Sequence, residues 1–357
     1  MTKTTYRNRK AVQLDTDELR VTVLVEGGHV AELFHKPTGT NPLWTPPWPS
    51  LEPSAYNEAE HPEYGRNAES RLLAGISGHN ICLDIFGGPS DEEAAAGLDV
   101  HGEGPVVPYE IGPDGDGLVC EAELPEAGLR FSRRLHIAAG GAVVRFRETV
   151  ENLRAADRPI GWTQHVTLGP PFLERGVTRF RATGARSKTM ESEFAGEHGF
   201  QKVGAGFDWP LAPLKDGAAS DLQVYTDAPV SGAFSTTLMD PSREHAHFIA
   251  WSPASRLVCG YVWKRSDFPW LGRWEENCSR ADPPWNSGTI TLGMEFGVSP
   301  MPESRRQMIE RGSLFGVPGF RWIPARTKVE VSYCAFLGRT DTIPEEVKWD
   351  GGGGVVW

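Results

Sequence analysis

The sequence predicts an all-β protein built from large antiparallel sheets, and three observations support this fold class. Segments with alternating polar and apolar residues recur about every 8–12 residues, as in antiparallel sandwiches and barrels. The chain has 40 Gly and 28 Pro among 357 residues, about 19% against a usual ~12%, and both are spread along it as turns. Helical patterns are few and short. We therefore expect one domain over residues 1–357, with its core at about 11–340.

The N-terminal third begins with a predicted hairpin. Residues 19–25 and 29–35 have strand character, and glycines turn the chain between them. Residues 37–66 are rich in Pro, Trp and Asn without periodicity, so we expect a long excursion over the surface or over the mouth of a site. Residues 91–97 predict a short helix, because they begin with acidic residues and end at Gly97.

The remaining chain reads as strand after strand, separated by glycine-rich turns. Proline near the start of residues 302–311 predicts a second helix there. The Gly-rich tail at 351–354 is compatible with a frayed or a tethered end. The expected strands are residues 117–124, 129–137, 142–150, a segment ending near Thr167, and 222–226, 232–238, 246–251, 256–263, 288–297 and 328–336.

Composition excludes several classes of function. The net charge is −11 without a basic stripe, which argues against nucleic acid and anionic membrane surfaces as partners. The five cysteines have no CxxC spacing, so the sequence suggests neither a zinc site nor a disulfide framework. No apolar run approaches the ~20 residues of a membrane span, and the N-terminus lacks the apolar segment of a signal peptide. We expect a cytoplasmic protein, either a monomer or a homodimer.

Two histidines and a glutamate are the strongest candidates for chemistry. His101, His165 and Glu295 each lie where a predicted strand meets a turn. Histidine titrates near neutral pH and a carboxylate can act as its base, so the three could form a proton-transfer site. If Leu292, Met294 and Phe296 share one strand face, Glu295 lies on the other face between two glycines. The alternatives are an outward-facing strand Glu, a sheet His bonded to a carbonyl, and a surface turn His.

Two further segments carry residues suited to binding hydroxyl groups. In residues 71–84, Gly, His, Asn and Asp lie at turn-like spacing, and the Asn and Asp side chains could instead bond their own backbone, as in Asx turns. Residues 267–277 are rich in Trp, which could stack on a sugar ring or pack in a corner of the core. The candidates are Arg71, His79, Asn80 and Asp84 in the first segment, Asp267, Trp270, Arg273 and Trp274 in the second, and Gln164 beside His165.

One histidine pair offers a different reading. His245 and His247 lie two residues apart, so both imidazoles would be on one strand face, where they could bind a metal ion. No HExxH spacing supports a metal site elsewhere, and we expect no metal.

The order of these motifs resembles the galactose mutarotase-like superfamily, specifically a divergent group related to aldose 1-epimerases. The resemblance covers roughly residues 20–335. It rests on residues 27–33 (GGHVAEL), 78–80 (GHN), 101–104 (HGEG), His165, and 293–296 (GMEF) followed by Pro300. It implies a large antiparallel β-supersandwich with a carbohydrate-binding cleft on one concave face.

The resemblance also implies roles. In such enzymes a strand carboxylate takes the proton of the C1 hydroxyl of a cyclic sugar, while a His protonates the ring oxygen. By position Glu295 would be the base, His165 the acid and His101 a second His on the ring-oxygen side, with no cofactor. The expected partner is a small carbohydrate.

The chain departs from the family pattern at three places. His79-Asn80 stands where an Asn-Arg pair is typical, and Arg71 or Arg273 could replace the missing Arg. The family's substrate-binding Asp has no clear counterpart, and Glu103 replaces a glycine. Two other functions therefore stay open: a non-catalytic carbohydrate-binding protein, and a sugar lyase or hydrolase that uses the same cleft, with Glu275 or Glu276 nearby.

Overall fold

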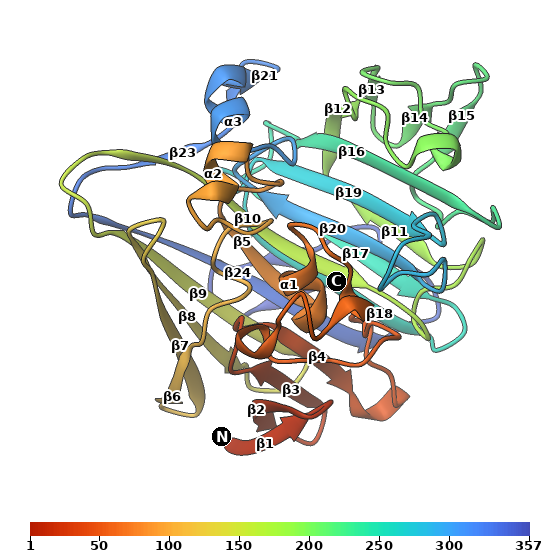
Figure 1. Cartoon of the computed structure of the whole chain (residues 1–357). Helices are drawn as coiled ribbons and strands as arrows, with labels where there is room; N and C mark the ends of the chain where they lie inside the picture. The colour runs from red at the N-terminus through yellow and green to blue at the C-terminus, as the bar shows by residue number, and fades with distance from the viewer.

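Two large antiparallel sheets make up most of the computed structural model, which describes residues 1–357 (Figure 1). The first has twelve strands, eleven in one path and β23 (Arg321–Ile323) paired to β10. The path runs in the order β1 (Thr2–Tyr6), β2 (Arg9–Asp15), β3 (Leu19–Leu24), β4 (Val30–His35), β5 (His79–Asp84), β10 (Arg158–Leu168), β20 (Ile290–Gly297), β19 (Trp270–Asn277), β16 (Ser231–Met239), β12 (Gly184–Thr189) and β13 (Gly206–Asp208).

The second sheet has eight strands, and short elements complete the fold. Its order is β11 (Arg179–Ala182), β17 (His245–Ser252), β18 (Leu257–Lys264), β24 (Lys328–Arg339), β9 (Val143–Asn152), β8 (Leu129–Ile137), β7 (Gly117–Leu124) and β6 (Glu110–Asp114). Three small pairs are β14 (Leu211–Pro213) with β15 (Ala219–Asp221), β21 (Ser313–Leu314) with β22 (Val317–Pro318), and β25 (Lys348–Trp349) with β26 (Val355–Val356). The helices are α1 (Ser70–Gly75), α2 (Asp91–Ala95) and α3 (Arg305–Arg311), with 3₁₀ turns η1 (Lys36–Thr38), η2 (Pro53–Ala55), η3 (Pro62–Tyr64) and η4 (Gly196–His198).

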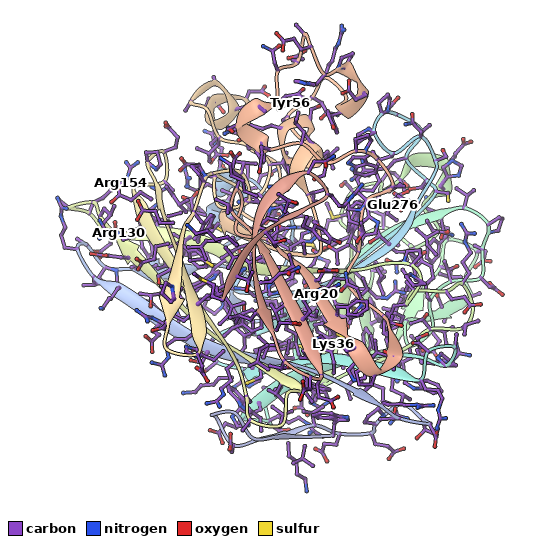
Figure 2. All side chains as sticks on the ribbon, turned by 90° about the horizontal axis from the view of Figure 1, so that it is seen from below. Arg20, Lys36, Tyr56, Arg130, Arg154 and Glu276 are labelled. Carbon is purple, nitrogen blue, oxygen red and sulfur yellow. The ribbon has the colours of Figure 1, made fainter.

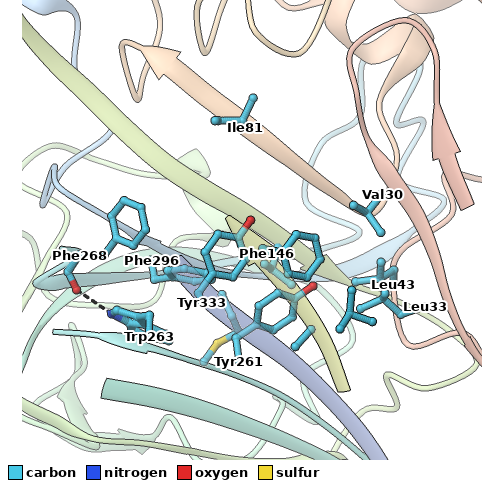
Figure 3. Close-up of a cluster of buried hydrophobic side chains, with 14 of the residues drawn as sticks. Val30, Leu33, Leu43, Ile81, Phe146, Tyr261, Trp263, Phe268, Phe296 and Tyr333 are labelled. Carbon is cyan, nitrogen blue, oxygen red and sulfur yellow. Dashed lines mark hydrogen bonds between the residues drawn. The ribbon is translucent and has the colours of Figure 1, made fainter. Parts of the chain in front are cut away.

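The main core lies between the two sheets. It is a cluster of 49 buried residues drawn from both of them, from Val12 to Leu337. Aromatic side chains pack at its centre, where Phe146 stacks on Tyr333 with ring centroids 4.7 Å apart and Trp263 on Phe296 at 4.3 Å (Figure 3). Burial of each such ring contributes about 2–3 kcal/mol, so this layer holds the sheets face to face.

A second apolar layer covers the other face of the twelve-stranded sheet. It is a cluster of 17 buried residues that includes Trp44 and Trp48 of the 37–66 segment, side chains of α1, and Trp274 and Trp285. Trp44 stacks on Trp285 with centroids 5.6 Å apart. The long segment therefore supports the loops that rise over this face, and the sheet is buried on both sides.

A buried polar network crosses the main core. Glu148 of β9 accepts hydrogen bonds from Arg133 of β8 at 2.7 Å and from Tyr333 of β24 at 2.7 Å. Its other oxygen accepts from Gln164 at 2.6 Å and Trp162 at 3.1 Å, both on β10 of the opposite sheet. The network therefore links the two sheets through one carboxylate.

Most predicted elements are present. The 19–35 hairpin is β3 and β4, the 91–97 helix is α2 with a Ser90–Glu93 capping box, and the glycine-rich tail is tethered, with Trp357 stacked on Phe336 at 5.0 Å. No helix of the structure combines the length and apolar character needed to cross a membrane.

Three expectations about elements were wrong, and one strand was not anticipated. Residues 222–226 form no strand, because only Val224 finds a β partner, in a single bridge. The second helix begins at Arg305 rather than near Pro302, because Ser304 caps it with Gln307. The turn-like cluster after residue 78 is strand β5, and the Trp-rich stretch is strand β19. Both strands are buried on both faces, so neither shows polar–apolar alternation.

The network predicts that two arginine substitutions lower the free energy of unfolding by very different amounts. In Arg133→Met the carboxylate of Glu148 would stay buried without its cation, so we expect the free energy of unfolding to fall by about 3–5 kcal/mol. Urea denaturation monitored by tryptophan fluorescence measures it. The control is Arg130→Met, because Arg130 lies at the edge of the molecule (Figure 2). This change breaks exposed pairs with Glu123 and Glu151 and should cost at most about 1 kcal/mol. Equal losses in the two variants would show that the network does not hold the sheets together.

Candidate active site

Strand register brings the predicted acid and base together. His165 of β10 lies directly opposite Glu295 of β20. The same row continues to Asn80 of β5 on one side and to Gly272 of β19 on the other. Directly opposed residues share a sheet face. The row therefore presents its polar groups on the face turned away from the main core.

The two faces of β20 divide as the sequence predicts. Leu292, Met294 and Phe296 belong to the main core, where Figure 3 shows Phe296 among the aromatic rings. Glu295 is on the opposite face beside Gly293, where an added Cβ would lie only 2.2 Å from the carboxyl Oε1. The glycine is needed because the carboxyl group folds back over its own strand.

Glu295 and His165 form a close buried pair. Nε2 of His165 lies 3.2 Å from Oε1 of Glu295, and the two side chains are 5% and 3% exposed. The other ring nitrogen, Nδ1, is in hydrogen-bond contact with Oγ1 of Thr167 at 2.9 Å. Oε1 of Glu295 has no aligned hydrogen-bond donor. A buried oxygen without a donor is the kind of group that a polar ligand would satisfy.

His101 completes the group from a different segment. Its backbone is in the left-handed region, with φ +67°, and its Nδ1 donates to the carbonyl of Phe86 at 2.5 Å. Its ring centroid is 5.1 Å from that of His165. At Gly102, an added Cβ would lie 2.3 Å from the carbonyl oxygen of Leu83, so glycine permits this close approach to β5. With Nδ1 engaged, Nε2 of His101 is the nitrogen left for a ligand.

The three side chains line one cavity of about 230 Å³. Trp274, Arg280 and Glu69 also line it, together with Gly87 and Gly88. The rest of the wall is apolar and comprises Leu72, Leu73, Ile76, Phe86, Val100, Met190, Phe194, Phe234, Trp285 and Pro302. This cavity can hold a small molecule with both polar and apolar surfaces.

Burial shifts the pKa values of Glu295 and His165 in opposite directions. It raises the pKa of Glu295 to about 8. It lowers the pKa of His165 well below its usual range, and the nearby His101 lowers it further. Burial also lowers the pKa of His101, while the Phe86 carbonyl opposes this shift. At neutral pH the resting site therefore holds a protonated carboxyl group beside neutral imidazoles, so one mobile proton is shared by a donor and an acceptor.

Three other predicted binding residues lie on the same sheet face but outside the cavity wall. Asn80 is fully buried beside His165, and neither atom of its side-chain amide has a hydrogen-bond partner. Trp270 donates to the carbonyl of Pro318 at 3.2 Å. Asp84 binds Arg158 and Arg305. Asn80 is thus the one of the three with unused polar atoms.

Three predicted residues lie on the opposite face. His79, Gln164 and Arg273 alternate with the cavity-facing residues of their strands, so they point between the sheets. His79 and Gln164 bond each other at 3.0 Å within the buried network. Arg273 pairs with Glu275 at 3.0 Å. The expectation that Arg273 replaces a substrate-orienting Arg is therefore corrected by strand alternation.

Two predicted residues are engaged in ion pairs away from the cavity. Arg71 contacts Asp99 at 3.0 Å, and Asp267 contacts Arg321 at 3.6 Å. Neither lines the cavity.

Sequence reasoning missed two charged residues of the cavity wall, Arg280 and Glu69, and one tryptophan, Trp285, besides the phenylalanines of the apolar wall. Arg280 and Trp285 come from the connection between β19 and β20, and Glu69 precedes α1. A Trp and an Arg in the loop that follows Trp274 were a signal for the first two. Nothing in the local sequence marks Glu69, because its partner lies 211 residues away.

The metal alternative finds no third ligand. No group of three or more His, Cys, Asp or Glu side chains is placed to hold an ion. The ring of His245 packs against Trp349 at a tilt of 56°, with centroids 5.0 Å apart.

Solved structures share this architecture. A protein from Klebsiella pneumoniae, provisionally named an aldose 1-epimerase, matches with a TM-score of 0.68 at 15% identity, over 94% of this chain and 80% of its own. A galactose mutarotase-like protein from Clostridium acetobutylicum matches with a TM-score of 0.61 at 13% identity, over 95% and 98%. No protein-family model and no curated protein sequence matches the chain. The predicted fold is confirmed: the chain has the galactose mutarotase-like fold.

The buried carboxyl group predicts a specific pH dependence of stability. A folded pKa of about 8, above the value of 4.5 for a free Glu, means that the folded state binds the proton more tightly. The contribution of Glu295 is therefore complete below pH 4.5 and declines as the pH rises to 8, by up to about 4–5 kcal/mol. Urea denaturation of the wild type and of Glu295→Gln across this range measures the difference. The stability of the wild type relative to Glu295→Gln should fall as the pH rises. A relative stability that stays constant or increases with pH would contradict the assignment, and a carboxyl ¹³C NMR titration provides a direct check.

Proposed function

We propose that this chain, which has the galactose mutarotase-like fold, is an isomerase of the aldose 1-epimerase type that interconverts the anomers of an aldose. One observation carries the proposal: the 3.2 Å approach of the Glu295 carboxyl group and the His165 imidazole at the wall of a small cavity. Anomer exchange needs a proton acceptor at the C1 hydroxyl and a proton donor at the ring oxygen. A facing carboxyl–imidazole pair supplies both.

The reaction begins with ring opening. Glu295, as the carboxylate, takes the proton of the C1 hydroxyl while the imidazolium of His165 donates a proton to the ring oxygen. The bond between C1 and the ring oxygen breaks, its electron pair stays on that oxygen, and C1 becomes the aldehyde carbon. The reactive pair, a carboxylate and an imidazolium, holds one proton, and so does the resting pair. In the resting pair this proton is on Glu295, so it must first move to His165.

Rotation and closure then give the other anomer. The aldehyde turns about the C1–C2 bond, and the ring oxygen attacks its opposite face. The protonated Glu295 returns its proton to the C1 oxygen, and the neutral His165 takes the proton from the attacking hydroxyl. Each group is the acid in one half of the reaction and the base in the other. The raised pKa of Glu295 brings that carboxyl group toward neutral pH, whereas the lowered pKa of His165 makes its imidazolium a stronger acid toward the ring oxygen.

Neighbouring residues support binding in this proposal. Trp274 lies 5.7 Å from His165 between ring centroids and offers an apolar face to the C–H groups of a sugar ring. Nε2 of His101 faces the ring-oxygen side. The unpartnered amide of Asn80, buried behind the cavity wall, would bond a water molecule beside His165. The proposed catalytic residues are thus Glu295 and His165, with His101 as the second histidine.

Exchange NMR tests the proposal. On a panel of aldoses, the wild type should accelerate anomer exchange of at least one sugar. Glu295→Gln and His165→Asn should each lower that rate by at least about 10²-fold while the sugar still binds, because each variant removes one proton-transfer partner. Glu123→Gln, an exposed carboxylate far from the cavity, serves as the control and should keep the full rate.

The same experiment separates the other functions. Binding without acceleration of any aldose would identify a carbohydrate-binding protein. Cleavage of a glycosidic bond, followed with aryl glycosides, would instead identify a hydrolase or lyase. Either result would contradict the proposed epimerase activity.

A further inference from the structure

Arg280 is the permanent cation of the cavity wall. It comes from the connection between β19 and β20, and its guanidinium lies over Trp285 at 4.9 Å and over Trp274 at 5.7 Å from the ring centroids. Because Trp274 also contacts His165, Arg280 belongs to the same cavity as the acid–base pair. The N–H donors of a guanidinium lie in one plane, and the contacts with two aromatic rings restrict the direction of that plane.

Its charge is already balanced by carboxylates. Nη1 of Arg280 donates to Oε2 of Glu69 at 2.8 Å, and Nε lies 3.8 Å from Oε2 of Glu276. Arg280 and Glu69 are each 34% exposed, which places their contact where the cavity meets solvent. Arg280 has five N–H donors, so this pairing leaves donors for a ligand but no uncompensated positive charge.

No other strong cation faces the cavity. Besides Arg280, its ionisable wall residues are Glu69, Glu295 and the two histidines, and burial lowers the pKa of both histidines. Arg71 and Arg273 are paired elsewhere. An anionic substituent entering here would meet the carboxylate of Glu69 without an unpaired cation to receive it, and most of the remaining wall is apolar.

We infer that Glu69 and Arg280 are the specificity-determining pair of the cavity, with Arg280 donating to hydroxyls of an uncharged aldose and Glu69 repelling aldoses that carry a carboxylate or phosphate. This inference rests on the proposed function for the identity of the ligand. Glu69 acts by compensating the positive charge of Arg280, so that the ion pair has no net charge. Removing its charge would free Arg280 to bind an anion.

The substitution Glu69→Gln tests this directly, because it keeps the size of the side chain and removes its charge. Glu69 makes no side-chain capping bond to α1, so the fold should persist. The probes are two matched pairs of sugars that differ only at C6, D-galactose with D-galacturonate and D-glucose with D-glucuronate. Dissociation constants from saturation-transfer NMR and rates of anomer exchange are measured for each.

We expect the wild type to favour the neutral member of at least one pair by tenfold or more. Glu69→Gln should improve acceptance of the uronate roughly tenfold, since a nearby negative charge has been removed. Glu69→Asp, which keeps the charge, should retain the rejection, and Glu123→Gln should behave as the wild type.

The outcomes distinguish the two proposals. Equal binding of neutral and anionic sugars by the wild type, or a Glu69→Gln variant with unchanged preference, would overturn the specificity role even if exchange is catalysed. Preferential binding of the neutral sugars without faster anomer exchange would contradict the epimerase activity but support the specificity role of Glu69 and Arg280. Binding of none of the probes would overturn the specificity role, because the cavity would then not be a site for aldoses.

Discussion

The carboxylate of Glu148 is the contact on which the geometry of the site depends. It sits between the sheets, accepts from Arg133 and Tyr333 on one side, and from Trp162 and Gln164 on the other. The last two residues belong to β10, and the next residue of that strand is His165. A buried charge tolerates only arrangements in which its donors stay in place. The network on one face of β10 therefore holds the imidazole on the other.

Strand alternation lets one strand serve both purposes. Along β10, Trp162, Gln164 and Val166 face the main core, while His165 and Thr167 face the cavity side of the sheet. Along β20, apolar side chains and Glu295 divide in the same way. The main core and the candidate active site lie on opposite faces of the same sheet. The packing that stabilises the fold therefore also fixes the distance between Glu295 and His165. No separate scaffold is needed for the site.

The sequence was informative where a structural feature depends on neighbouring residues alone. The 19–35 hairpin and the face of Glu295 follow from period-2 alternation, and α2 follows from its capping residues. Local pattern failed where both faces of a strand are buried, as in β5 and β19. His79 and Asn80 looked equivalent, and only the pairing of β5 with β10 shows that Asn80 shares the row of His165. Contacts between distant loops, such as Glu69 with Arg280, leave no local pattern to read.

The backbone conformation of His101 has a consequence for which residue this position can hold. A left-handed conformation costs a non-glycine residue about 1–2 kcal/mol, and glycine adopts it freely. A change to glycine here would relieve that backbone cost, but it would also remove a ring whose Nδ1 is bonded to the carbonyl of Phe86. The backbone and the side chain therefore favour different residues at this position. The cavity keeps its second imidazole at the cost of a conformation that only glycine adopts without strain.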